Sequence, residues 1–190
     1  LLQDANIPIL FRPLHEAAGN YTKYNKDGGA WFWWGRYGAS YCKQLYQLLY
    51  KTFTNTYHLN NIIWVWTIDA AEGYEHEALE WYPGDEYVDV ISYDYYPGQH
   101  KHDTAAAYLE KIQCATYENK LCALSENGAL PNVTKLAEEH SPWSWFCTWN
   151  GEFTVEKGKY SEKYTSKELL QKYYQEPWLI TRDELPKFID

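Results

Sequence analysis

The chain has 190 residues, of which 45% are hydrophobic, so it is long enough and apolar enough to bury a core in a single domain. With 17 Lys and Arg against 26 Asp and Glu, its formal net charge is −9, which disfavours nucleic acid and anionic membrane surfaces as partners because both would repel it. The longest apolar run, Ile62–Ile68, has the length of a strand and not the roughly 20 residues of a membrane span.

Two features of the composition stand out. Methionine is absent, even at position 1, so we expect a processed chain or a fragment. There are also 10 Trp and 19 Tyr against 6 Phe. Trp and Tyr combine a flat apolar face with a polar group, which suits surfaces that stack on sugar rings as well as protein cores.

The cysteines show no CxxC spacing. Four cysteines allow three disulfide connectivities, and nothing in the sequence favours one of them. We expect buried free thiols, because reduced cysteine behaves as a small hydrophobic residue. The residues concerned are Cys42, Cys114, Cys122 and Cys147.

Short apolar runs rich in β-branched and aromatic residues predict strands. Most of them are nearly continuous apolar runs, which is typical of parallel strands buried on both faces. The predicted strands are Ile7–Leu14, Ile62–Ile68, Tyr87–Tyr93, Leu121–Leu124 and Trp145–Trp149.

The stretches between these runs have helical periodicity. Ser40–Asn55 places Leu45, Leu48, Leu49 and Phe53 on one face. Capping residues predict the other helices: Asp103 before Thr104–Tyr117, with Tyr108, Leu109 and Ile112 inward; Asn132 before Val133–His140; Ser166 before Lys167–Tyr174; and Thr181 with Glu184 as a capping box.

Strands that alternate with helices predict right-handed βαβ units and a parallel sheet. Five strands could complete a doubly wound sheet, whereas a (β/α)8 barrel needs eight strands and typically about 250 residues. If the functional residues indicate a barrel, about three βα units are therefore missing from the front.

The first candidate motif, Arg12-Pro13-Leu14-His15-Glu16, ends the first predicted strand. Strand alternation would place Arg12, Leu14 and Glu16 on one face. A zinc-binding HExxH helix is excluded, because Gly19 stands three positions after Glu16. The Trp31-Phe32-Trp33-Trp34-Gly35 segment follows; its tryptophans fit core packing, but a Trp-dense loop beyond a strand end is harder to explain by packing alone.

Polar and aromatic residues also end the other strands. Glu126 would project at the tip of the fourth, on the face of Cys122 and Leu124, although an exposed glutamate before a turn would look the same. The remaining candidates are Trp66 on the second strand, Ser92, Asp94 and Tyr96 at the third, and Trp145, Cys147 and Trp149 on the fifth. Barrel active sites are built at this C-terminal rim.

Two carboxylates among tyrosines and tryptophans are what glycoside hydrolysis requires. One must be protonated to give a proton to the leaving oxygen, and the other must be ionised to attack or to stabilise positive charge. Tyr96 or Arg12 could hydrogen-bond the ionised carboxylate, and Trp149 could form the floor of a sugar subsite.

In this order, RPLHEAAG…WFWWG, WVWT, YPGDEYVDVISYDYY, LSENG and a final-strand Trp resemble family 26 of the glycoside hydrolases. The resemblance covers essentially the whole chain, from the family's fourth strand to its eighth. It implies α/β architecture, namely a (β/α)8 TIM barrel that here lacks roughly its first three βα units, and a retaining mechanism.

The resemblance also implies roles for individual residues. The acid/base falls on Glu16, with the family's histidine at His15, and the nucleophile falls on Glu126. Tyr96 would hydrogen-bond the nucleophile, with Asp94 two residues before it. The aromatic platform falls on Trp149, while Trp31, Trp34 and Trp66 are further substrate-binding candidates. One departure is Asn150, where the family usually has Arg.

From this resemblance we expect residues 1–190 to be part of a catalytic domain that cleaves internal β-1,4-mannosidic bonds of mannan or glucomannan without a metal or cofactor. β-1,3-Xylan and mixed-linkage glucan are alternative substrates, and a non-catalytic sugar-binding module or an inert fragment is the rival. We expect a monomer that acts outside the cell or at its surface. Alone, the chain is expected to be poorly stable and inactive, because an incomplete sheet has unpaired edges.

Overall fold

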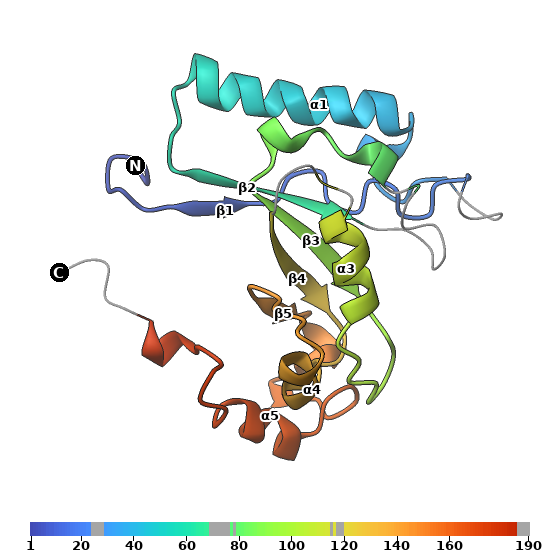
Figure 1. Ribbon diagram of the computed structural model, residues 1–190, viewed down its shortest axis with the longest axis vertical. Helices are drawn as coiled ribbons and strands as arrows, with labels where there is room; N and C mark the ends of the chain where they lie inside the picture. Colours follow the sequence, from blue (N-terminus) through green and yellow to red (C-terminus); the bar gives the residue numbers. More distant parts are fainter. Residues whose placement is uncertain (24–28, 69–76, 78, 115, 117–119, 186–190) are drawn as a thin grey trace. The chain divides into compact units, whose positions relative to one another are not determined.

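A five-stranded sheet organises the chain (Figure 1). The computed structural model describes residues 1–23, 29–68, 77, 79–114, 116 and 120–185. The strands, which pair in the order given, are β1 (Ile9–Phe11), β2 (Ile62–Ile68), β3 (Val90–Tyr95), β4 (Leu121–Asn127) and β5 (Phe146–Thr148). Both β1 and β3 run parallel to β2, with Phe11 opposite Trp64 and Val65 opposite Val90.

Each strand pairs with the next strand along the chain, and helices occupy the connections. These are α1 (Ala39–Lys51) between β1 and β2, α3 (Ala106–Cys114) between β3 and β4, and α4 (Val133–Glu138) between β4 and β5. A doubly wound sheet reverses its strand order part-way, whereas a (β/α) barrel keeps sequential order. The chain therefore folds as part of a (β/α) barrel.

The described residues form two compact units. The first comprises Leu1–Asp94, Ala106–Ser125 and Trp143–Phe146, and the second comprises Tyr95–Ala105, Glu126–Pro142 and Cys147–Asp190. The first unit contains a core cluster of Val65, Val90 and Ala123, with Ile63 and Trp145 packed against it. No helix in the described parts of the chain is long and apolar enough to cross a membrane.

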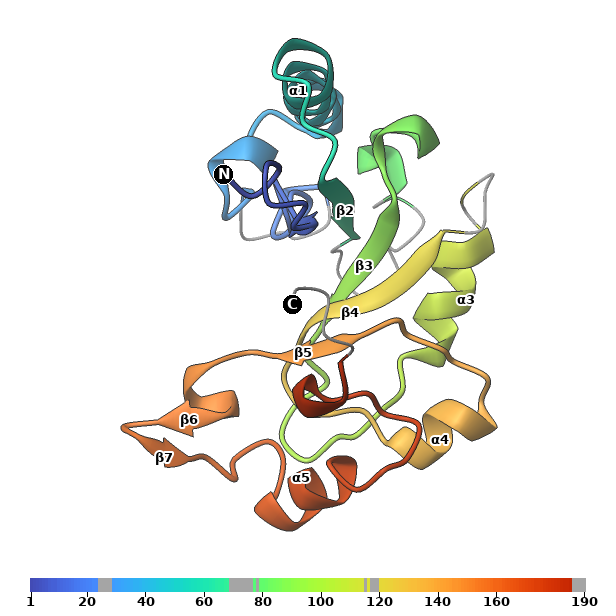
Figure 2. The same ribbon diagram turned by 90° about the vertical axis from the view of Figure 1, so that its left-hand side faces the viewer.

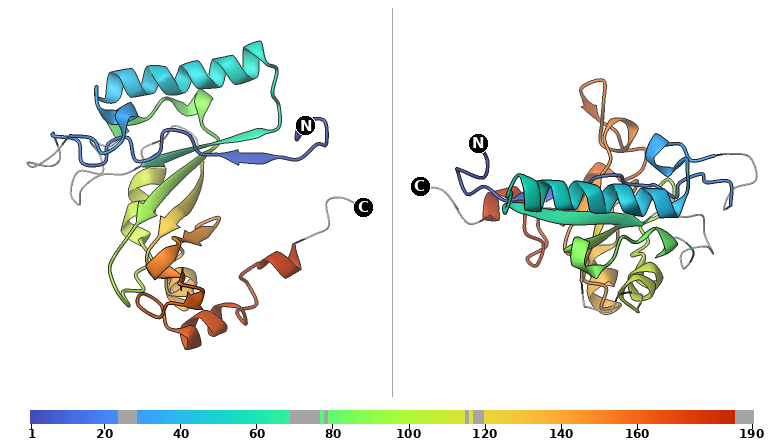
Figure 3. Two further views of the ribbon diagram at one scale, coloured as in Figure 1. Left: turned by 180° about the vertical axis from the view of Figure 1, so that it is seen from behind. Right: turned by 90° about the horizontal axis from the view of Figure 1, so that it is seen from above.

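In the first unit, α1 lies along β2 (Figures 1 and 3). Its buried residues are Cys42 and Tyr46. The Trp64 ring of β2 packs against the rings of Tyr46 and Tyr50, with centroids 5.9 and 5.1 Å apart. Leu48, which was predicted to share a face with Leu45, Leu49 and Phe53, is 61% exposed, whereas Cys42 and Tyr46 are buried.

The second unit contains α4, α5 (Lys167–Tyr173) and the antiparallel hairpin of β6 (Val155–Glu156) and β7 (Lys159–Tyr160), which Figure 2 shows most clearly. Three of the four predicted caps are confirmed: Asn132 accepts from the Lys135 amide at 3.1 Å, Ser166 accepts from the Leu169 amide at 3.2 Å, and Thr181 with Glu184 forms a capping box on a short 3-10 helix. α4 and α5 end two residues and one residue before their predicted bounds.

The observed bounds of β1 and α3 differ from the predicted ones. β1 ends at Phe11 rather than Leu14, because Pro13 has no amide hydrogen for the sheet and Leu14 has a φ of 54°. α3 begins at Ala106 because Ala105 has a φ of 55°; Asp103 accepts from the Ala105 amide in a turn outside the helix, so it is not the predicted cap.

The other bounds differ less. The predicted β2 is confirmed at both ends, and α1 continues as one π turn, Thr52–Thr56, so helical structure covers the predicted segment. β3 begins at Val90 because Asp85–Tyr87 form a 3-10 helix. β4 continues to Asn127, whereas β5 is one residue shorter at each end than predicted.

The cysteine prediction is confirmed in part. Cys42 and Cys122 are buried free thiols, whereas Cys147 is a free thiol that is exposed. The side chain of Cys114 lies outside the described part of the structure. Burial raises the pKa of Cys42 to about 12 and that of Cys122 to about 11.

We expect a thiol alkylating agent at neutral pH to modify Cys147 and to leave Cys42 and Cys122 unmodified until the protein is unfolded. Neutral pH is far below the pKa of both buried thiols, so neither is present as the reactive thiolate. Burial also keeps the alkylating agent away from both sulfur atoms. Mass spectrometry of peptides, with and without denaturant, measures the labelling. Equal labelling of the three thiols in folded protein would contradict this assignment.

Candidate active site

The end of β1 places Arg12 against the end of β3. One guanidinium nitrogen of Arg12, Nη1, donates to both carboxylate oxygens of Asp94, at 3.1 and 2.9 Å, and to the Thr67 hydroxyl at 3.2 Å. The Asp94 side chain is only 1% exposed. A buried carboxylate is costly unless it is paired and hydrogen-bonded, and Arg12 supplies that pairing.

A row of hydroxyls extends this ion pair across the strands. The Ser125 hydroxyl of β4 lies 2.7 Å from a carboxylate oxygen of Asp94 and 2.8 Å from the hydroxyl of Ser92. Ser92 in turn lies 2.9 Å from the Thr67 hydroxyl of β2. Ser92 and Asp94 therefore face the same network, and polar contacts join β2, β3 and β4 near their C-terminal ends.

Glu16 lies in the loop after β1 and not on the strand. Leu14 and Glu16 have φ angles of 54° and 51°, a region that non-glycine residues rarely adopt. The prediction that strand alternation places Arg12, Leu14 and Glu16 on one face is therefore wrong, because the strand ends at Phe11. A turn, and not the pleat of a strand, directs the Glu16 side chain.

The Trp-rich segment, Trp31–Gly35, packs against the loop that carries Glu16. The His15 ring packs against both Phe32 and Trp34, with ring centroids 4.9 and 5.7 Å away. The Trp34 indole nitrogen donates to the His15 carbonyl at 2.9 Å, and its ring stacks on Phe32 at 4.3 Å. Trp34 thus holds the backbone beside Glu16.

Gly35, at the end of the Trp-rich segment, packs closely against the backbone of the loop that carries Glu16. A Cβ atom at this position would lie 2.0 Å from the Ala17 carbonyl oxygen and 2.9 Å from the Ala30 Cβ. Only a residue without a side chain allows the two segments to approach this closely. Because Ala17 follows Glu16 directly, this approach sets the position of the Glu16 backbone.

We expect Gly35→Ala to lower the free energy of unfolding by about 3 kcal/mol, because the added methyl group must displace the Ala17 backbone. The measurement is chemical denaturation of the complete catalytic domain. Gly29→Ala is the control, since a Cβ there would meet nothing within 4 Å and should change stability by less than about 0.5 kcal/mol. Equal effects of the two substitutions would contradict the account.

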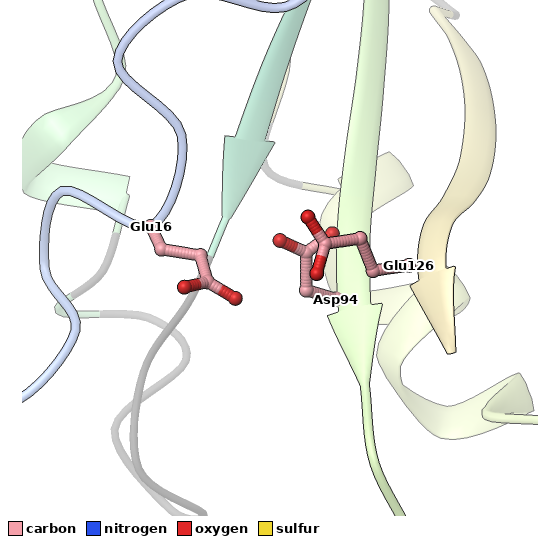
Figure 4. Close-up of side chains that lie close together, drawn as sticks. All are labelled: Glu16, Asp94 and Glu126. Atoms are coloured by element: carbon pink, nitrogen blue, oxygen red, sulfur yellow. The ribbon is translucent and has the colours of Figure 1, made fainter. Parts of the chain in front are cut away.

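The Glu16 side chain extends toward the end of β3, where Asp94 lies (Figure 4). A carboxylate oxygen of each residue lies within 4.8 Å of the other. Two carboxylates at this distance could contribute to a cation site, but both oxygens of Asp94 already accept hydrogen bonds from Arg12, and one also contacts Ser125. We therefore assign Asp94 to the polar network and propose no metal here.

In the second unit, Tyr96 and Glu126 form a pair. The Tyr96 hydroxyl donates to Glu126 Oε2 at 2.7 Å, and Glu126 is 6% exposed. Glu126 stands near the end of β4, whereas Tyr96 follows the last residue of β3. The sequence predicted this contact by resemblance.

The tryptophans fall into different surroundings. Trp149, in the second unit, is 45% exposed, and Trp31, in the first, is 55% exposed. Either face could stack on a sugar ring. Trp66 is 4% exposed, and its ring packs against Tyr82 at 5.0 Å, so its immediate role is in the core.

Sequence reasoning missed the partners of the polar network. It proposed Arg12 as a hydrogen-bond donor to the ionised catalytic carboxylate, but it did not foresee that Arg12 donates to Asp94, Thr67 and Ser125. Hydroxyls near strand ends are the signal that could have indicated such a network. Their partners lie up to 113 residues away, so spacing alone could not have assigned them.

The family model for glycosyl hydrolase family 26 matches residues 1–184. The chain belongs to this family. Among curated proteins, this family 26 chain is 34% identical over its whole length to a mannan endo-1,4-beta-mannosidase of Thermothelomyces thermophilus, covering 34% of that protein. It is 33% identical over 98% of its length to mannan endo-1,4-beta-mannosidase B of Piromyces sp, covering 28% of it. The chain thus spans about a third of these relatives.

Solved structures agree with the family assignment. A ruminal GH26 endo-beta-1,4-mannanase is 37% identical, with a TM-score of 0.84 over 97% of this chain and 38% of that one. A beta-mannanase from a symbiotic protist of the termite Reticulitermes speratus, complexed with gluco-manno-oligosaccharide, is 34% identical, with a TM-score of 0.79 over 97% of this chain and 50% of that one. The family 26 chain therefore has the fold of the corresponding part of these enzymes.

Proposed function

We propose that this chain is part of the catalytic domain of a retaining endo-β-1,4-mannanase. The observation that carries the proposal is the hydrogen bond from Tyr96 to the buried carboxylate of Glu126. A carboxylate that attacks as a nucleophile must be ionised, and an ionised carboxylate accepts hydrogen bonds such as the one from the Tyr96 hydroxyl. The names of the family 26 relatives supply the substrate class.

In the first step, the Glu126 carboxylate attacks the anomeric carbon of the β-linked mannosyl residue. The bond from that carbon to the glycosidic oxygen breaks, and Glu16 gives its proton to the departing oxygen. In the second step, Glu16, now ionised, takes a proton from water as that water attacks the anomeric carbon and releases Glu126. The configuration at the anomeric carbon is retained, because it is inverted twice.

This mechanism requires the carboxyl groups of Glu16 and Glu126 to stand about 5–5.5 Å apart in the complete domain. The acid must be protonated while the nucleophile is ionised, so the two carboxyl groups must lie in different environments. In the second unit, Glu126 accepts a hydrogen bond from the Tyr96 hydroxyl.

The remaining candidates have subsidiary roles in this proposal. Trp149 and Trp31 offer exposed aromatic faces to sugar rings, and His15 is held beside Glu16 by its aromatic contacts. Asp94, with Arg12, keeps the strand ends in place. Trp34 and Trp66 have supporting roles, because Trp34 donates to the His15 carbonyl and Trp66 packs against Tyr82.

Within the complete protein, we propose that this chain supplies the fourth to eighth strands of a (β/α)8 barrel, and that about three further βα units precede them. We also propose that the enzyme is a monomer and acts outside the cell or at its surface, where a polymeric glycan is met. The termite protist relative was solved with gluco-manno-oligosaccharide, which supports mannan or glucomannan as the substrate.

The test is to incubate the complete catalytic domain with β-1,4-mannan, β-1,3-xylan and mixed-linkage glucan, and to follow the first products by proton NMR. We expect oligosaccharides from mannan, released first as the β-anomer. Preferred cleavage of xylan or glucan would overturn the substrate, and first release of the α-anomer would overturn the retaining mechanism. Binding of mannan without cleavage would favour a sugar-binding module.

A further inference from the structure

A segment outside the candidate site, Gly151–Tyr164, follows Trp149 in the second unit. It contains the 3-10 helix Gly151–Phe153 and the β6–β7 hairpin (Figure 2). Its two ends are joined: Glu152 forms an ion pair with Lys163, and the Tyr164 hydroxyl donates to Glu152 at 3.2 Å. The hydrogen bond from Lys163 lowers the pKa of Glu152, so the pair is charged at neutral pH.

Phe153, near the start of this segment, packs against Tyr96. The two rings meet edge to face, with centroids 5.4 Å apart and planes at 66°. On another side the Phe153 ring lies 4.2 Å from that of Tyr164. Phe153 therefore stands between the closed end of the hairpin segment and the tyrosine that donates to Glu126.

The backbone at the end of β4 completes this packing. A Cβ atom on Gly128 would lie 3.1 Å from Tyr96 and 3.2 Å from Phe153, so the absence of a side chain lets both rings pack tightly against the residue after β4. The His100 amide donates to the Tyr164 carbonyl at 3.1 Å, which ties the loop after Tyr96 to the same end of the hairpin segment.

We propose that Phe153 is a positioning residue, whose ring, held by the hairpin segment, keeps the Tyr96 hydroxyl aimed at Glu126. This inference rests on the proposed function, in which Glu126 is the nucleophile. An edge-to-face contact favours one orientation of a neighbouring ring, and a hydrogen bond to a carboxylate weakens steeply when its donor is misdirected. In this role Phe153 acts through Tyr96 rather than on the sugar.

A double-mutant cycle in the complete catalytic domain tests the proposal, with kcat and KM measured on β-1,4-mannan. We expect Tyr96→Phe to lower kcat about tenfold or more, because it removes a hydrogen bond to a charged acceptor. Phe153→Ala should lower kcat about tenfold with little change in KM. In the Tyr96→Phe background, Phe153→Ala should have no further effect on kcat, because no hydroxyl is left to be aimed.

Val155→Ala is the matched control, at a position of the same hairpin that is 55% exposed, and it should leave both constants unchanged. If Phe153→Ala does not fold, Phe153→Leu takes its place in the cycle. An equal loss of kcat in both backgrounds, or a change in KM alone, overturns the positioning role. An inactive wild-type domain defeats the proposed function as well, whereas an active wild type with an additive cycle defeats only this inference.

Discussion

Glu126→Gln should lower mannan hydrolysis by the complete domain about 10³-fold or more. Glutamine keeps the shape of the side chain and can still accept a hydrogen bond from Tyr96, but it cannot attack the anomeric carbon as an anion. The initial rate of reducing-sugar release measures the effect. Glu110→Gln, at an exposed position of α3, is the matched control and should keep wild-type activity.

Unchanged release of reducing sugar by Glu126→Gln would favour a binding module or a contaminating enzyme.

The substitution Glu16→Gln should distinguish the role of Glu16 from that of Glu126. Without its acid the enzyme should cleave mannan about 10²- to 10⁴-fold more slowly. It should still cleave aryl β-mannosides whose phenolate leaves without protonation, as far as the covalent intermediate. Loss of both reactions would contradict the assignment of Glu16 as the acid.

Asp94→Ala should lower the free energy of unfolding of the complete domain by about 3–5 kcal/mol. Removing the carboxylate takes away the charged group that the Arg12 guanidinium, only 22% exposed, contacts at 2.9 Å. It also removes an acceptor that Ser125 contacts at 2.7 Å. Urea denaturation, compared through midpoints and slopes, measures the change.

An exposed ion pair provides the matched control. Lys172 and Glu168 are one turn apart on α5, with side chains 66% and 80% exposed, and Lys172→Ala should cost less than about 1 kcal/mol. Arg12→Met combined with Asp94→Ala should be less destabilising than the sum of the two single changes, because no charge is then left unpaired. A loss for Asp94→Ala as small as that of the control would contradict the structural role of this pair.

Local patterns in the sequence predicted local structure well. The apolar run Ile62–Ile68 forms β2 with the predicted bounds, and the Asn132 and Ser166 side chains cap helices as their types favour. The alternation of strands and helices indicated βαβ units, and the sheet order then selected the barrel over the doubly wound alternative. These features depend on contacts within a few residues or on the order of elements.

The candidate site was less predictable, because its side chains are placed by contacts distant in sequence. Arg12 pairs with Asp94 across 82 residues, and the turn that carries Glu16 requires a φ of 51° that strand alternation cannot anticipate. Trp66 packs against Tyr82, a residue that lies outside β2 and later in the chain. The residue pattern offered Tyr96 or Arg12 as the donor to an ionised carboxylate, and the resemblance to family 26 then paired Tyr96 with Glu126.

Trapping of the covalent intermediate tests the central claim most directly. The complete domain would be incubated with a 2-deoxy-2-fluoro-β-mannosyl fluoride, which slows release of the intermediate, and then digested with trypsin. The peptide Leu121–Lys135 contains Glu126 as its only side-chain carboxyl, and Glu16 lies on a separate peptide. We predict a fluoromannosyl adduct on that peptide at Glu126. An adduct on another residue, or continued turnover with no adduct at all, would contradict the assignment of Glu126 as the nucleophile.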